Sequence, residues 1–401
     1  MAAVPVGPSV SALAVRLRTY RLRTLTAEVS QHVVAALPDY PGVVAVTAAD
    51  LRDACAVSVE QMLRELAGEG ERIKLQETGR RRAQEGLPVE WLLHGFRLCG
   101  RVIWEGLVGE ATRAGDDCMR RLLDEAVVVW DALDHVSTLV TKAYREEQSR
   151  LQRTTQRRRE LVLSTLLDRP PASASAGDEA GEVLAIPVRG PRVVVVSTVG
   201  SGHPEKALRA AGFTSAWVTQ GARDVGLLSL LSADDLPRAT AVLAACLPGA
   251  VTVSPLIDSF DEVATAHRLA ALTLRTLPAS YQGIARVTDR LPHTLVAGVP
   301  DVADVLVRHT LGGLLAVRSS EREVYLSTLE ALVDADGSFA GAARKLYCHR
   351  NTVLKRAHRI EALTGRRLTS TRALVELYLA VLAVRMDTHR SGENGRYAPR
   401  A

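Results

Sequence analysis

The stretch SFAGAARKLYCHRNTVLKRAHRIEALTGRRLTSTR, residues 338–372, concentrates positive charge on a two-helix pattern. Nine of its residues are Arg or Lys and only Glu361 is acidic, which gives a charge of +8. The whole chain carries +5, so the remainder sums to −3 (+5 minus +8). The positive charge is therefore local, and local positive charge of this kind is typical of a nucleic-acid site.

The same stretch carries helix start and stop signals. Ser338 predicts an N-cap, because its hydroxyl can accept from the free N–H groups at the start of a helix. The Ala-rich helix that follows is interrupted at residues 347–349, and a second helix is predicted from Arg350 to Thr364, with Gly365 as its stop. Two short helices joined by a tight turn are typical of a helix-turn-helix. An ordinary helical hairpin with a solvated basic face is the alternative.

The second helix has one apolar side and one polar side. At about 100° per residue, the apolar stripe comprises Val353, Ala357, Ile360 and Leu363. The residues that point away from it are Asn351, Lys355, His358 and Arg359. We expect Arg350, Asn351 and Lys355 to contact base edges, since Arg suits guanine and Asn suits adenine. The residues expected to contact phosphates are Arg344, Lys345, His349, Thr352, Arg359, Arg366 and Arg367.

Residues 326–368 resemble the C-terminal domain of the PucR/CdaR group of bacterial transcriptional regulators. The resemblance is carried by Thr328-Leu329, by Ala342-Ala343 with Leu346, by His349-Arg-Asn-Thr-Val353 and by Arg359-Ile-Glu-Ala-Leu-Thr-Gly365. Leu354-Lys355-Arg356 departs from the Arg-Tyr-Arg-like triplet of many relatives, which implies that different bases are read. The resemblance implies a DNA-binding domain over residues 321–386. Residues 387–401 have no apolar period, which predicts a disordered tail.

Composition favours a cytoplasmic protein without a membrane partner. Arg outnumbers Lys 45 to 5, which reflects a GC-rich genome more than a function, so only the clustering of charge is informative. The five cysteines are scattered, as expected of unpaired thiols in a reducing compartment. No apolar run approaches the 18 residues or so that a membrane span needs, and the first 25 residues lack a signal-like hydrophobic core.

Residues 11–168 are predicted to form an all-helical input and dimerisation domain. A continuous helix is expected over residues 119–144, with a long apolar stripe at helical spacing, followed by a charged helix over residues 143–167. The run from Gly79 to Leu107 resembles the N-terminal domain of RsbT co-antagonist proteins, which implies a globin-like, dimeric domain. A haem site with His94 or His135 as ligand is disfavoured, because no second histidine stands at a supporting spacing. No cofactor is expected, and an effector or a protein partner remains open.

Residues 169–182, RPPASASAGDEAGE, have the composition of a linker, and an α+β domain is predicted over residues 183–310. Its β-α-β-β-α-β order favours a ferredoxin-like sheet with helices on one face. Residues 251–255 and 260–274 resemble the last strand and helix of GGDEF nucleotide cyclases. Cyclase chemistry needs metal-binding carboxylates, but residues 197–200 read Ser-Thr-Val-Gly and the hairpin offers only Asp224. The loop Gly200-Ser-Gly-His203 lacks a P-loop lysine. A degenerate domain without catalysis is therefore expected.

These patterns together predict a mainly α, multidomain transcriptional regulator that binds double-stranded DNA as a homodimer and is not an enzyme. The alternative is a signalling adaptor that docks a kinase or an anti-sigma-type partner through its helical N-terminal domain. Placement of charge separates the two hypotheses, since an adaptor does not need nine basic residues around His349. Nucleotide processing by residues 183–300 is the weaker alternative.

Overall fold

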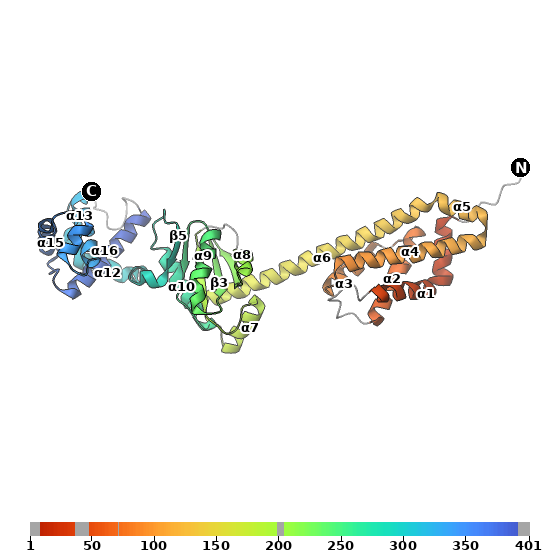
Figure 1. Ribbon diagram of the computed structural model, residues 1–401, viewed down its shortest axis with the longest axis horizontal. Helices are drawn as coiled ribbons and strands as arrows, with labels where there is room; N and C mark the ends of the chain where they lie inside the picture. The colour runs from red at the N-terminus through yellow and green to blue at the C-terminus, as the bar shows by residue number, and fades with distance from the viewer. Residues whose placement is uncertain (1–8, 37–47, 71, 199–203, 392–401) are drawn as a thin grey trace. The chain divides into compact units, whose positions relative to one another are not determined.

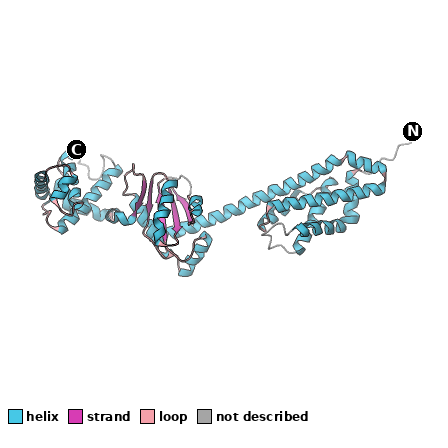
Figure 2. Cartoon of the chain, in the orientation of Figure 1, coloured by secondary structure: helices cyan, strands magenta, loops and turns pink. Residues whose placement is uncertain are grey.

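The computed structural model describes residues 9–36, 48–70, 72–198 and 204–391. These residues divide into two compact units, 1–156 and 157–401, and each unit is described by itself. Helix is the main secondary structure, and the strands lie together in one sheet (Figure 2). The loop from Gly200 to His203, which was weighed as a phosphate-binding loop, lies outside the described residues.

The described residues of the first unit form helices and no strands, as predicted. Its helices are α1 (Val10–Ala36), α2 (Ala48–Leu66), α3 (Arg72–Gln84), α4 (Val89–Ala114), α5 (Asp116–Asp124) and the first part of α6 (Ala126–Asp168) (Figure 1). They share one apolar core, to which α6 contributes Val129, Val136, Val140 and Tyr144. The helix predicted over residues 119–144 is divided at Glu125, whose carboxylate accepts from the backbone N–H of Val10 at 2.8 Å. The prediction of one continuous helix was therefore wrong at Glu125, whereas the predicted apolar stripe is confirmed.

The second unit contains a five-stranded sheet. Its strands are β1 (Arg192–Ser197), β2 (Thr214–Gln220), β3 (Arg223–Ser229), β4 (Ala250–Val253) and β5 (Gly283–Arg286). Their order is β2-β3-β1-β4-β5, with antiparallel pairing throughout except that β5 lies parallel to β4. The first four strands and their two crossover helices have the predicted ferredoxin-like order. β5 was not predicted, because only Ala285 of its four residues is buried.

Helices cover both faces of this sheet, so the prediction of helices on one face only was wrong. α8 (Glu205–Ala210) and α9 (Leu236–Cys246) pack on the face that presents Val193 and Val195. On the other face, α10 (Val263–Leu274), α7 (Ala174–Leu184) and the end of α6 cover Val194 and Val196. The reason is the composition of β1, whose six residues are all buried: a strand that is apolar on both sides needs cover on both faces.

The predicted linker over residues 169–182 is wrong, because most of it lies in helix α7. Ser173 caps this helix by accepting a hydrogen bond from the backbone N–H of Ala176 at 3.2 Å. Gly177 and Gly181 pack closely against the ring of Phe260, and Leu184 is fully buried. The small residues that gave this segment the composition of a linker therefore allow the helix to pack closely against Phe260.

The C-terminal helices are α11 (Leu291–Gly298), α12 (Pro300–Leu315), α13 (Ser319–Val333), α14 (Phe339–Lys345), α15 (Arg350–Thr364) and α16 (Thr371–Ser391). Val307, Leu311 and Leu314 of α12 lie in the same apolar core as Leu329 and Ile360. This core therefore begins well before residue 321. The residues left between the two predicted domains, 311–320, include the end of α12 and the start of α13. α16 continues to Ser391, so the predicted disordered tail begins too early, and residues 392–401 lie outside the described range. Within the described ranges, no helix has the length and apolar character that crossing a membrane requires.

Candidate nucleic-acid interface

The basic stretch forms two short helices with a tight turn between them. α14 begins after Ser338, whose hydroxyl accepts from the backbone N–H of Gly341 at 3.1 Å. α15 begins after His349, whose Nδ1 accepts from the backbone N–H of Asn351 at 3.2 Å, and it ends at Gly365 in the left-handed conformation, with φ +66°. The predicted limits of the second helix, Arg350 and Thr364, are confirmed.

Packing fixes the orientation of α15. Val353, Ala357 and Ile360 are buried in the C-terminal core, with Leu363 packed at its edge, as the helical spacing predicted. The polar positions Asn351, Lys355, His358 and Arg359 are exposed. The helix therefore presents one continuous polar surface, and its first two turns carry the three residues that were predicted to contact bases.

Those three residues, Arg350, Asn351 and Lys355, are all exposed. Among the residues that the structure describes, none of their side chains makes a hydrogen bond or an ion pair with the protein. The backbone of Asn351 is held by the His349 cap, which leaves the side-chain amide free. Residues whose backbone is held in a helix and whose polar side-chain groups have no partner within the protein suit the recognition of base edges.

The residues predicted to contact phosphates lie in different surroundings. Arg344 and Arg367 are exposed, and Thr352 is half-buried. Lys345 is exposed but pairs with Asp334 at 3.1 Å. His349 uses Nδ1 as an acceptor for the cap, so its neutral form carries the proton on Nε2, where it can donate outward.

Two further arginines have partners within the protein. Arg359 interacts with the hydroxyl of Tyr325, whose pKa is raised mainly by its hydrogen bond to the Glu321 carboxylate and lowered in part by Arg359. The side chain of Arg366 is only 20% exposed and forms an ion pair with Glu376 of α16. The structure therefore places Arg366 in an intramolecular contact that the sequence did not indicate, because its partner is ten residues away in another helix.

Tyr347 was not predicted as a site residue. It lies in the turn between α14 and α15 with φ +51°, and its side chain is 98% exposed. Residues other than glycine, asparagine and aspartate rarely adopt the left-handed conformation. In the sequence, the interruption of the helical pattern at residues 347–349 indicated a turn at this position, but it did not indicate that the ring of Tyr347 is exposed.

The sheet domain shows no arrangement that supports cyclase chemistry within the described residues. Asp224, the only carboxylate predicted near the hairpin, is buried, and its Oδ1 accepts from the Thr219 hydroxyl at 2.7 Å. Among the described residues, no group of three or more His, Cys, Asp or Glu side chains is placed to hold a metal ion.

Two family models match the chain. The RsbT co-antagonist protein rsbRD N-terminal domain matches residues 23–159, and the PucR C-terminal helix-turn-helix domain matches residues 325–383. A search of curated proteins gives no match. Among solved structures, the crystal structure of a regulator of polyketide synthase expression from Bifidobacterium adolescentis aligns with 58% of this chain and 98% of its own, with 17% identity and a TM-score of 0.31.

The two matched ranges contain the residues that carry both resemblances noted in the sequence. Gly79 to Leu107 lies inside the first range, and the His349-Arg-Asn-Thr motif lies inside the second. The chain thus combines an RsbT co-antagonist-type N-terminal domain with a PucR-type C-terminal helix-turn-helix domain.

Proposed function

We propose that this protein is a transcriptional regulator that binds double-stranded DNA sequence-specifically through α15. The observation that carries the proposal is the free, exposed set of Arg350, Asn351 and Lys355 at the start of the second helix of a helix-turn-helix. In this motif, the N-terminal residues of the recognition helix contact base edges in the major groove. A protein acting on DNA in this way would work in the cytoplasm.

Sequence is read by Arg350, Asn351 and Lys355 in this proposal. Arg and Lys donate to guanine O6 and N7, and the Asn amide pairs with adenine N6 and N7. The surrounding groups fix the register by contacting phosphates: Arg344, Lys345, His349, Thr352, Arg359 and Arg367. Arg366 would hold the turn after α15 against α16 through Glu376 and would contribute less to DNA directly.

The other domains serve regulation and not catalysis in this proposal. The sheet domain is a degenerate relative of the GGDEF domains in which Asp224 has a structural role. The first unit provides the dimer contacts, and two copies of α15 then contact two half-sites. No cofactor or metal enters the proposed activity.

The proposal is tested by capturing genomic fragments with the purified protein and measuring affinity for the recovered site and for random DNA. We expect affinity to fall steeply with salt, because phosphate contacts release counterions. Asn351→Ala and Lys355→Ala should each cost about 1–3 kcal/mol at the recovered site and little on random DNA. Arg367→Ala should weaken both DNAs equally and reduce the salt slope by about one unit.

Arg157→Ala is the matched control, since Arg157 is an exposed arginine of α6 outside the helix-turn-helix and should change neither affinity. Equal losses on both DNAs for the Asn351 variant would contradict the assignment of α15 as the recognition helix. Binding that is absent, or that does not depend on salt, would favour the adaptor hypothesis instead.

A further inference from the structure

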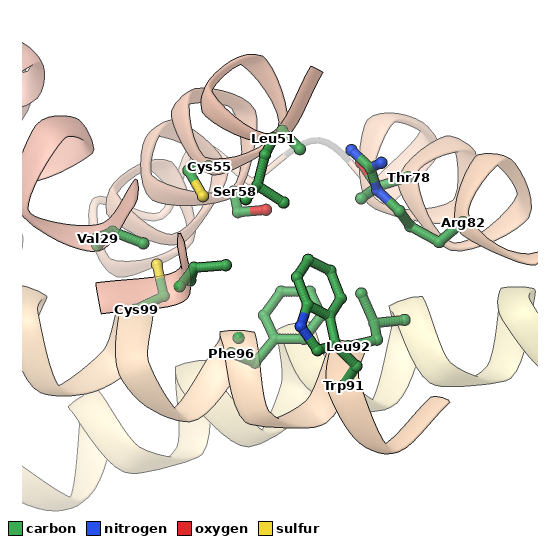
Figure 3. Close-up of a pocket in the computed structure, with 13 residues that line it drawn as sticks. Val29, Leu51, Cys55, Ser58, Thr78, Arg82, Trp91, Leu92, Phe96 and Cys99 are labelled. Atoms are coloured by element: carbon green, nitrogen blue, oxygen red, sulfur yellow. The ribbon is translucent and has the colours of Figure 1, made fainter. Parts of the chain in front are cut away.

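A pocket in the first unit is too small to be a small-molecule site. Residues of α1, α2, α3 and α4 line it, among them Cys55, Trp91 and Phe96 (Figure 3), and its volume is about 40 Å³. Small-molecule sites usually have roughly 300–1,000 Å³. Arg82, which also lines this pocket, pairs with the Glu85 carboxylate, so its charge is already compensated. A side chain that the packing of the domain does not explain lies instead in the second unit, in the turn between α14 and α15.

Tyr347 occupies the helix-ending position that glycine usually takes. Its backbone N–H donates to the carbonyl of Arg344 at 3.3 Å, and the N–H of Cys348 donates to the carbonyl of Ala343 at 3.1 Å. These two hydrogen bonds, with φ +51° at Tyr347, form the Schellman motif that ends α14. α15 also ends at a left-handed residue, and there the chain has Gly365. Tyrosine at residue 347 therefore carries a conformational cost that glycine would avoid.

The side chain of Tyr347 contributes little to the packing of the domain. The residue is 98% exposed, and among the described residues its hydroxyl has no hydrogen-bond partner. Its neighbours Leu346 and Cys348 do pack against the C-terminal core. Because the two backbone hydrogen bonds of the Schellman motif hold the turn, the Cα–Cβ bond of Tyr347 leaves the surface in a fixed direction. The ring is thus presented to solvent and is not a part of the core.

The turn lies where this domain would meet the DNA backbone. Only Cys348 and His349 separate Tyr347 from Arg350, so the Cα atoms of Tyr347 and Arg350 lie within about 11 Å of each other. The major groove is roughly 12 Å wide and is bordered by phosphates, so Tyr347 reaches its edge when the start of α15 enters it. Arg344 and Arg350 flank Tyr347 in the chain, and both are exposed and unpaired among the described residues. Their charge attracts phosphate, and tyrosine hydroxyls are among the usual donors to phosphate oxygens.

We propose that Tyr347 is a further DNA contact, whose hydroxyl donates a hydrogen bond to a phosphate at the edge of the groove that α15 enters. The inference rests on the proposed DNA-binding function and adds a residue to it. Because the phenol is neutral, this contact orients α15 on the DNA but releases no counterion. Tyr347 differs in this respect from the arginines around it, whose contacts make binding depend on salt.

Tyr347→Phe removes the hydroxyl and keeps both the ring and the turn. Its affinity for the recovered site and for random DNA should fall by about tenfold on each, as expected for a lost hydrogen bond to a charged group. The dependence of affinity on salt should keep its slope, because no cation is removed. Fluorescence anisotropy at several salt concentrations measures both quantities. Tyr20→Phe is the matched control, since Tyr20 is an 80% exposed tyrosine of α1 outside the helix-turn-helix and should change neither.

A second measurement identifies the phosphate. The phosphates of the recovered site are replaced one at a time by uncharged methylphosphonate, and each DNA is titrated with the wild type and with Tyr347→Phe. One position in each half-site should weaken binding of the wild type but not of the variant. Denaturant titration should give the variant the stability of the wild type, so that lower affinity does not reflect unfolding.

The outcomes separate this contact from the proposed function. If Tyr347→Phe binds both DNAs as tightly as the wild type, while Asn351→Ala loses affinity for the recovered site, the Tyr347 contact alone is overturned. A reduced salt slope, or a methylphosphonate series in which no position distinguishes the variant from the wild type, would overturn it as well. Absence of DNA binding by the wild type would overturn the proposed function together with this contact.

Discussion

Tyr347 shows how a single residue can combine backbone strain with complete exposure. Its φ of +51° belongs to the left-handed region, and the residue is 98% exposed, so burial of its ring does not offset the cost of this conformation. A left-handed residue with a Cβ costs about 1–2 kcal/mol, which glycine avoids. Strain that persists without a packing gain is frequent at functional sites, and this turn joins the two helices proposed to bind DNA.

We therefore predict that Tyr347→Gly raises the free energy of unfolding by about 1 kcal/mol. Tyr347→Ala is the control, because alanine loses the ring but keeps the strain, and it should leave stability nearly unchanged. Denaturant titration of both variants and the wild type measures the difference. Glycine and alanine variants of equal stability would show that the backbone conformation of Tyr347 does not cost what its φ implies.

Among the elements, α11 carries a histidine that should make stability depend on pH. His293 is half-buried, and burial, with a smaller effect of Arg290, lowers its pKa from the usual 6.5 to about 4. Its Nδ1 is buried without a hydrogen-bond partner among the described residues. Between these two pKa values the unfolded chain binds a proton and the folded chain does not. Stability contributed by neutral His293 is therefore present above about pH 6.5 and is lost as pH falls toward 4.

We expect this group to lower the free energy of unfolding by roughly 1–2 kcal/mol between pH 7 and pH 5. His293→Gln keeps a polar side chain that does not titrate, so it should remove that part of the pH dependence. Urea titrations of both proteins at the two pH values measure it. A variant that loses as much stability as the wild type over this range would contradict the shifted pKa.

At the scale of the whole molecule, one helix-turn-helix contacts only a half-site and binds too weakly to select a single genomic address. Homo-oligomers usually have two-fold symmetry, and we expect the helical first unit to form the dimer. Two copies of α15 should then read half-sites spaced by about 10 base pairs or a multiple of that.

Removal of residues 1–156 should leave a folded fragment that binds the full site much more weakly. The cut follows the division between the units, and it retains Leu163, Leu166 and Leu167, which lie in the core under the sheet. Analytical ultracentrifugation should find a full-length dimer and a monomeric fragment. A full-length monomer that holds one half-site tightly would contradict this arrangement.

The sequence by itself determined the local structure of the C-terminal domain. The cap at Ser338 fixed the start of α14, and the stop at Gly365 with an apolar stripe at helical spacing fixed the end and the buried side of α15, because these signals act within one or two turns. The exposed positions of Arg350, Asn351 and Lys355 followed from the same periodicity. The charge excess that marks the surface is also a property of the sequence alone.

Only the tertiary structure decided the features that depend on distant partners. α7 is a helix because its glycines pack on Phe260, some eighty residues away, although its composition resembles a linker. Arg366 is paired because the chain returns through α16 and brings Glu376 to it. Local signals fix where elements begin and which side they bury, whereas the fold decides which residues then meet.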